Sequence, residues 1–298
     1  METIDIDNQP SSLTQYTRAA QRAAAEVIDT YSTSFGWSSK LLSKTLANHV
    51  RNIYALVRVA DEIVDGAAAE ALQDSFAVDP LAVLDQMERD TYRALECGFS
   101  SNLIIHAFAT TARLVGIERD LVQPFFTSMR MDINRRIYDQ RGFDLYVYGS
   151  AEVVGLMCLK AFLHTRLVSD EQNTDFITGA RALGSAFQKV NFLRDLAADL
   201  KKLGRSYFPH IRIEEFTEEQ KLALVLDISR DLATARNALV KLPLSSRRAV
   251  SAAQMMFTEL NTVIKATPAE RLIETRVRVS NPKKLAIFIK AWFGVTPR

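Results

Sequence analysis

Cysteine is nearly absent from this sequence, and glycine and proline are scarce. Only Cys97 and Cys158 occur, and their spacing is not that of metal-binding or redox pairs, so a disulfide framework and a structural zinc site are excluded. Eleven glycines and eight prolines among 298 residues are few for an architecture of strands and tight turns. With 48% hydrophobic and 24% charged residues, the composition is that of a folded globular protein. The sequence therefore favours a helical fold.

Long apolar runs and an excess of charge of one sign are also missing. The sequence has no stretch of about 18 uncharged apolar residues that would cross a bilayer. Its first dozen residues are acidic and polar, unlike a signal peptide. The formal net charge of +2 is too small to indicate nucleic-acid binding. We expect a cytoplasmic protein without a nucleic-acid partner.

Helical periodicity runs through most of the chain. Apolar residues recur at spacings of 3, 4 and 7, as at Ile53, Leu56, Ala60 and Ile63. Turn residues such as Asp79-Pro80 and Gly98 separate the periodic segments. Neither a linker nor an internal repeat is visible, so we predict a flexible segment over 1–12 and one all-α domain over 13–298. The helices are predicted over about 14–29, 50–64, 80–95, 102–115, 119–138, 143–165, 175–203, 217–238, 247–265 and 283–293.

A first acidic motif places Asp61 and Asp65 four residues apart, on one face of a helix. Two like charges in that position repel each other, and the surrounding residues are mostly apolar. A solvated surface pair is one interpretation. The other is a divalent cation, since carboxylate oxygens are ligands for magnesium.

A second polar stripe favours the metal interpretation. Asn191, Asp195 and Asp199 follow one another at steps of four, with Gln188 beside them and leucine and phenylalanine on the other faces. Two acidic stripes, each flanked by an arginine, suit metal ions that bridge a polyphosphate. Arg205 and Tyr207, just beyond, are then candidates for hydrogen bonds to diphosphate oxygens, although cations near a helix end also favour its dipole.

Together these motifs resemble those of the squalene/phytoene synthases over about 15–295. The matching segments follow the family's order: Tyr31-Ser-Thr-Ser34-Phe35 for its HSxSF element, Arg58 and Asp61-Glu-Ile-Val-Asp65 for the first DxxxD, Met129-Arg-Met-Asp132 and 146–157 for the central segments, Gln188, Asn191, Arg194, Asp195 and Asp199 for QxxNxxRDxxxD, Arg205-Ser-Tyr207-Phe-Pro209 for RxYxP, and Arg276-Val-Arg-Val with Lys283 and Lys284 for the basic C-terminal segment. Three departures are Tyr31 in place of a histidine, Ala198 in place of an acidic residue, and Phe257 in place of a tyrosine.

The resemblance implies an isoprenoid-synthase-like helical bundle around a central cavity. It implies a prenyltransferase of carotenoid biosynthesis that joins two geranylgeranyl diphosphates head to head, through a cyclopropyl diphosphate, to C40 phytoene. Magnesium would be the cofactor, with manganese as the alternative metal, and NADPH would not be needed.

The same resemblance assigns roles to individual residues. The metal ligands would be Asp61, Asp65, Asn191, Asp195 and Asp199. The substrate would be bound by Tyr31, Ser34, Phe35, Arg58, Tyr146, Gln188, Asn191, Arg194, Arg205 and Tyr207. Catalysis would rest on the four aspartates together with Arg58 and Tyr146.

Three alternatives stay open. A squalene or dehydrosqualene synthase would use the C15 farnesyl diphosphate, and squalene formation would require NADPH. A cyclising terpene synthase places serine or threonine in its second metal motif, where this chain has Arg194-Asp195. A catalytically silent helical assembly factor would release no diphosphate.

Very hydrophobic substrates predict contact with a membrane. Because we expect no spanning segment, we predict peripheral attachment to the inner face of the cell membrane, aided by Lys283, Lys284 and Lys290. Packing of Trp292 and Phe293 onto the core is the competing interpretation. Downstream carotenoid enzymes are further candidate partners.

Overall fold

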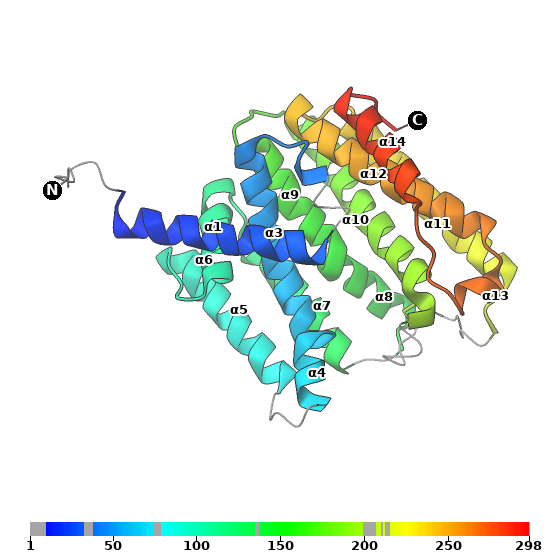
Figure 1. Ribbon diagram of the computed structural model, residues 1–298, viewed down its shortest axis with the longest axis horizontal. Helices are drawn as coiled ribbons and strands as arrows, with labels where there is room; N and C mark the ends of the chain where they lie inside the picture. The colour runs from blue at the N-terminus through cyan, green and yellow to red at the C-terminus, as the bar shows by residue number, and fades with distance from the viewer. Residues whose placement is uncertain are drawn as a thin grey trace.

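A computed structural model describes residues 10–32, 38–73, 79–134, 137–198, 207–209, 211 and 215–297. Within these ranges the chain is helical and forms no β-strand, which confirms the all-α class. The helices pack around one central helix (Figure 1). In chain order they are α1 (Ser12–Tyr31), α3 (Lys44–Val64), α4 (Ala67–Gln73), α5 (Pro80–Cys97), α6 (Leu103–Val115), α7 (Arg119–Asn134), α8 (Gln140–Val147), the π-helical turn η2 (Tyr148–Glu152), α9 (Val153–Leu163), α10 (Asp170–Ala198), α11 (Glu218–Leu239), α12 (Leu244–Ala266), α13 (Ala269–Leu272) and α14 (Asn281–Trp292).

Side-chain caps explain where many of these helices begin. The Asp79 carboxylate accepts the backbone N–H groups of Leu81 and Ala82, with Pro80 in the first turn of α5 as its sequence predicts. Gly98 ends α5 at a φ of 80°, a left-handed conformation that glycine adopts without strain. Thr217 and Gln220 form a reciprocal capping box at the start of α11.

The observed helices differ from the predicted ones mainly at their ends. Helix α7 stops at Asn134, four residues before the predicted end, and α10 begins at Asp170, five residues earlier than predicted. The short helices α4 and α13 were not predicted, because four to seven residues are too few to show a helical period. Of the expected flexible segment over 1–12, residues 1–9 lie outside the described residues, whereas Ser11 caps α1 and Ser12 begins it.

The central helix is a continuous run from Gln140 to Leu163, made of α8, η2 and α9. By length and composition alone this run could cross a membrane, contrary to the expectation that no segment could. It packs against α3, α7 and α10, and its Glu152 pairs with Arg181 of α10. These contacts are those of the core helix of a bundle.

Glycines let the central helix touch its neighbours backbone to backbone. A methyl group added at Gly149 would overlap the Pro124 carbonyl oxygen and the Ser128 hydroxyl of α7. A methyl group at Gly155 would lie 2.7 Å from the Ala180 carbonyl oxygen, and one at Gly184 would lie 2.6 Å from that of Ala151. The small residues of the central segment therefore serve close helix packing.

Two apolar cores lie on either side of the central helix. The first gathers side chains of α3, α5, α6, α7 and α9, including the fully buried Phe108, Phe125 and Phe126. The second gathers side chains of α8, α10, α11 and α12. Burying one such large side chain contributes roughly 1.5–3 kcal/mol to folding, so both cores stabilise the bundle.

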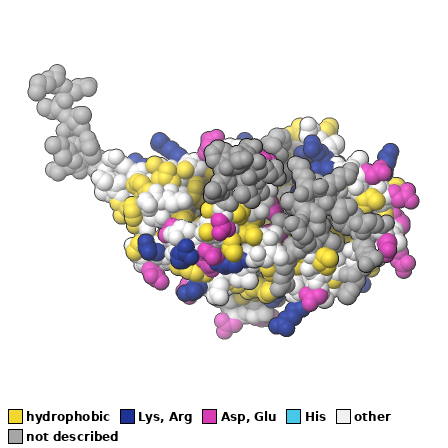
Figure 2. All heavy atoms as spheres, turned by 90° about the horizontal axis from the view of Figure 1, so that it is seen from below, with side chains coloured by type: hydrophobic (Ala, Val, Ile, Leu, Met, Phe, Trp, Pro, Cys, Tyr) yellow, Lys and Arg dark blue, Asp and Glu magenta, His cyan; other side chains and the backbone are white. Residues whose placement is uncertain are grey.

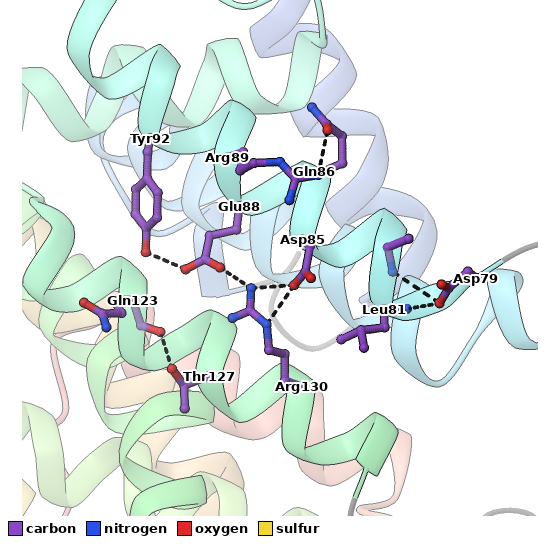
Figure 3. A network of polar contacts seen from close by, with 11 residues as sticks. Asp79, Leu81, Asp85, Gln86, Glu88, Arg89, Tyr92, Gln123, Thr127 and Arg130 are labelled. Carbon is purple, nitrogen blue, oxygen red and sulfur yellow. Dashed lines mark hydrogen bonds and ion pairs between the residues drawn. The ribbon is translucent and has the colours of Figure 1, made fainter.

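A polar network outside these cores joins α5 to α7 (Figure 3). The Arg130 guanidinium donates to the Asp85 carboxylate at 2.6 Å and to Glu88, which also accepts the Tyr92 hydroxyl at 2.5 Å. The Arg119 guanidinium lies 4.3 Å from the centre of the Tyr92 ring. Arg130 is thereby turned towards α5, which leaves the opposite side of α7 to contact α8.

The substitution Gly149→Ala should destabilise the protein by about 1–3 kcal/mol, because the contacted carbonyl oxygen of Pro124 is backbone and does not move aside cheaply. Urea unfolding followed by circular dichroism measures the change. Ser150→Ala is the matched control on the next residue, since its hydroxyl has no partner among the described residues. Equal stability of the two variants would contradict the close approach of α7 and the central helix.

Candidate functional site

An apolar cavity of about 280 Å³ runs between α3, the central helix, α10, α11 and α12. Small residues of η2, α9 and α10 form much of its wall, including Ala151, Gly155 and Ala180. Phe187 of α10 and Phe257 of α12 also line it, and their rings stack with centroids 3.7 Å apart. Phe257, which stands in place of the family's tyrosine, thus completes an apolar wall.

Polar groups mark one end of the cavity. The lining residues of α10 run from Phe176 to Asn191, a length of roughly 22 Å at 1.5 Å per residue. Asp195 follows Asn191 by one turn, and Asp61 follows the lining residue Val57 of α3 by one turn. Both acidic motifs therefore lie just beyond the same end of the cavity. In Figure 1 the C-terminal ends of α3 and α10 both lie at the lower side, and Figure 2 shows acidic and basic side chains close together on that face.

The first motif forms a charged cluster at the end of α3. Arg58 Nη1 lies 2.7 Å from Asp61 Oδ2, and the same guanidinium pairs with Glu62. Burial lowers the pKa of Arg58, but the two carboxylates raise it by more, so its pKa lies above the usual value. The guanidinium also lies 4.5 Å from the centre of the Tyr31 ring. The structure thus brings Tyr31, Arg58 and Asp61 together, with Asp65 capping the helix behind them.

The second motif lies at the end of α10. Asp195 pairs with its neighbour Arg194 and with Arg276, whose Nε lies 2.6 Å from Asp195 Oδ1. Asn191 lines the cavity, and its side-chain oxygen is buried and has no hydrogen-bond partner among the described residues. Gln188 is partly buried one turn earlier on the same helix.

Acidic side chains at these positions oppose the helix dipole. Asp61 and Asp65 end α3, and Asp195 is in the last turn of α10, where partial negative charge accumulates on the free carbonyl groups. Each such carboxylate is destabilising by about 0.3–1 kcal/mol relative to a neutral side chain. The arginines offset part of this charge, and a bound cation would offset more.

Carboxylate and amide oxygens are suitable ligands for a hard cation such as magnesium. The unpartnered oxygen of Asn191 adds a neutral donor to the carboxylates of the site. Within the described part of the chain, no three His, Cys, Asp or Glu side chains converge on a common point. Magnesium typically takes only one or two carboxylates and completes its shell with water and phosphate. The residues therefore fit magnesium held jointly with a phosphorylated ligand.

A buried carboxylate near this end holds two tyrosines. Asp132 of α7 accepts a hydrogen bond from the Tyr146 hydroxyl of α8 at 2.8 Å and from the Tyr207 hydroxyl at 3.2 Å. The Tyr207 ring stacks on Phe192 of α10 with centroids 4.1 Å apart, and Tyr138 contacts both tyrosine rings. Burial raises the pKa of Tyr146 well above the usual 10.0, and the Asp132 charge raises it further. Tyr146 therefore remains a hydrogen-bond donor.

The structure places most of the predicted residues around the polar end, in two groups. Tyr31, Arg58, Asp61 and Asp65 form one group, and Gln188, Asn191, Arg194 and Asp195 share the last turns of α10. Tyr146 and Tyr207 belong to the buried tyrosine cluster and are not among the residues that line the cavity. The predicted residues Ser34, Phe35, Asp199 and Arg205 lie outside the described residues.

Two further residues of the site were not predicted as such. Asp132 and Arg276 stood in segments that matched the family motifs, but neither was given a role. The position of Asp132 beside the apolar residues Met131 and Ile133 was a signal for it, because a buried carboxylate requires partners. No local signal pointed from Arg276 to Asp195, since the two are 81 positions apart.

Comparison with known proteins shows which family the chain belongs to. The profile of the squalene/phytoene synthases matches residues 28–283. The chain belongs to this family. Its fold is likewise that of a dehydrosqualene synthase solved in complex with a ligand, with a TM-score of 0.75, 21% identity and coverage of 93% of this chain and 96% of the other.

Among relatives in the squalene/phytoene synthase family, the 15-cis-phytoene synthase of Pantoea ananas is 24% identical over 90% of this chain and 89% of its own length. The bifunctional lycopene cyclase/phytoene synthase of Blakeslea trispora is 24% identical over 88% of this chain. The match spans about half of that relative, 47% of its length. Membership of this family also supports the assignment of the chain as a prenyltransferase of isoprenoid biosynthesis.

The raised pKa of Tyr146 makes a prediction about stability at high pH. The unfolded chain loses this proton first, so the stabilisation is complete below pH 10.0 and decreases as the pH rises further. In urea unfolding at about pH 8 and about pH 10.5, wild-type protein should lose more stability between the two conditions than Tyr146→Phe does. Equal losses in both proteins would contradict the buried, protonated state of Tyr146.

Proposed function

We propose that this protein joins two molecules of geranylgeranyl diphosphate head to head and forms the C40 hydrocarbon phytoene. Two diphosphates and two protons leave in the course of the reaction, one proton as the cyclopropyl diphosphate forms and one in the last step. The observation that carries this proposal is an apolar cavity with acidic and basic side chains gathered just beyond one end. Such a cavity suits a molecule with a long apolar tail and a highly charged head.

Magnesium would be held by Asp61, Asp65, Asn191, Asp195 and Asp199, of which Asp199 lies outside the described residues. When bound, the metal supplies positive charge that stabilises diphosphate as a leaving group. The carboxylates at the helix ends thus serve as its counter-charges. Manganese, with the same preference for oxygen ligands, is the alternative metal.

The arginines of the site would bind diphosphate directly. Arg58 and Arg194 stand beside the two acidic motifs, and Arg276 reaches Asp195 from the segment before α14. A guanidinium presents several N–H donors in a fixed plane, which matches phosphate oxygens. Part of each arginine's interaction with its aspartate would then be exchanged for contacts with the substrate.

The cavity wall would protect the carbocation that remains after diphosphate leaves. Its lining is apolar over most of its length, so little water could reach the cation. The stacked rings of Phe187 and Phe257 face this space, and an aromatic face stabilises a cation by roughly 0.5–2 kcal/mol. Released diphosphate would accept the proton lost in the last step.

Substrate length would depend on the apolar end of the cavity. This end is lined by Phe176, which lies far along α10 from Asn191, and by Leu242 and Val250, which pack in the same apolar cluster as Phe176. Each buried CH₂ group contributes about 0.8 kcal/mol, so one more isoprene unit favours the longer substrate by a few kcal/mol where the cavity accepts it. The alternative function is a squalene or dehydrosqualene synthase, which would use the shorter C15 diphosphate. We further propose that phytoene passes to downstream carotenoid enzymes, and that NADPH takes no part.

Substitutions in both acidic motifs test the role of the site. Asp61→Asn and Asp195→Asn should each lower turnover of geranylgeranyl diphosphate by orders of magnitude, because each removes a carboxylate that would hold the metal charge next to the leaving diphosphate. Phosphate assays and helical circular dichroism measure activity and fold, and excess EDTA should abolish activity in the wild type. Asp175→Asn is the matched control, since Asp175 on the same helix pairs with Lys241 at the surface. Full activity in either site variant, or in EDTA, would contradict the metal site.

Product analysis tests the choice of substrate. With equal C15 and C20 diphosphates and no NADPH, the main product should be C40 phytoene. A predominantly C30 product, or a requirement for NADPH, would favour the alternative function instead. A complete lack of diphosphate release would favour a non-catalytic protein.

The substitution Val250→Phe should shift the products towards C30, because the larger ring fills the apolar end of the cavity and overpacks it against a C20 tail. The ratio of C30 to C40 product measures the shift. Val83→Phe adds the same volume at an exposed position of α5 and serves as the control. An unchanged ratio in Val250→Phe would contradict this position for the end of the substrate.

A further inference from the structure

The last helix, α14, is apolar on its outer side as well as on its inner side. Its inner residues Ile287 and Ala291 are buried against the bundle. Its outer residues include Leu285, Ile289 and Trp292, and Phe293, which caps its C-terminal end, is the most exposed of the four at 77%. A surface helix normally presents charged residues to water, so an apolar outer stripe indicates a second partner.

The charge on α14 itself is positive, although Lys283 is paired with Glu259 of α12. From Thr275 to Arg298 the sequence contains six basic residues and no acidic one. Lys283 and Lys290 are exposed on α14 itself, and Lys284 is partly exposed. A helix with an apolar face flanked by lysines is typical of segments that lie in the interface of an anionic membrane. Trp292, at the end of the helix, is a residue type enriched at that depth.

The outer face of α14 is separated from the cavity by a single layer of structure. The inner side of α14 packs on Ala249 and Leu42, and both of these residues also line the cavity. In Figure 1 α14 lies at the upper right on the outside of α12, whereas the C-terminal ends of α3 and α10 lie at the lower side. The face is therefore next to the apolar part of the cavity and away from its charged end.

We propose that the outer face of α14 binds the surface of a bilayer that contains anionic lipid. Leu285, Ile289, Trp292 and Phe293 enter the boundary between headgroups and acyl chains, and the lysines contact lipid phosphates. Lys284 and Lys290, on a helix that carries no acidic residue of its own, favour anionic lipid over a second copy of the chain, because the lysines of two such faces would repel each other.

Vesicle flotation without substrate tests the proposal independently of the reaction. The full chain should float with vesicles of phosphatidylglycerol and phosphatidylcholine, and should bind less to phosphatidylcholine alone or at high salt. The double variant Trp292→Ser, Phe293→Ser should reduce the bound fraction by about ten-fold or more. Leu114→Ser with Leu167→Ser removes two exposed apolar side chains from other surfaces and should bind as the wild type does.

The lysines provide a second variant that leaves the apolar face intact. Lys284→Gln with Lys290→Gln should weaken binding to anionic vesicles by roughly five-fold per cation, and should leave the weak binding to neutral vesicles unchanged. Light scattering of the lipid-free protein detects the competing occupant. Wild-type protein that fails to float, or that forms a dimer abolished by the Trp292 and Phe293 variant, would overturn the proposal. A loss of vesicle binding in Leu114→Ser with Leu167→Ser as large as that in the Trp292 and Phe293 variant would also overturn the proposal.

Discussion

Backbone contact between the central helix and its neighbours determines the spacing of the whole bundle. Gly149 brings η2 against α7, and Gly155 and Gly184 bring the central helix against α10. Any side chain at these positions would push the helices apart by its own volume. Because α10 and the central helix form adjoining walls of the cavity, their separation also sets its width. Packing in the interior and the shape of the cavity are thus consequences of the same three contacts.

Apolar and charged side chains are separated along the axes of α3 and α10. Helices α3 and α10 line the cavity with apolar side chains and carry aspartates where they end. This polarity follows from the sequence of each helix, because a step of one turn moves a side chain along the axis without turning it far from the cavity. A ligand with a charged head and an apolar tail would find both environments in the correct order. Neither helix alone would provide them.

The fold class, most helix positions and the two acidic motifs could be predicted from sequence, because each depends on residues close together in the chain. Asp61 with Asp65, and Asn191 with Asp195, needed only helical spacing. The partnership of Arg276 with Asp195 could not be predicted in this way, because it arises where the segment before α14 returns to the end of α10. The cavity volume and the tyrosine cluster around Asp132 likewise depend on helices meeting in three dimensions.

The π-helical turn in the central helix has a consequence for the register of the chain. Such a turn holds one residue more than an α-helical path would, which corresponds to a rotation of about 100°. Helix α9 is therefore rotated relative to α8, and this rotation lets Val154, Gly155 and Cys158 face the cavity. A chain shorter by one residue in this turn could keep both helices, yet it would present another face of α9 to the substrate. An insertion or deletion in this turn therefore changes which residues form the wall of the cavity.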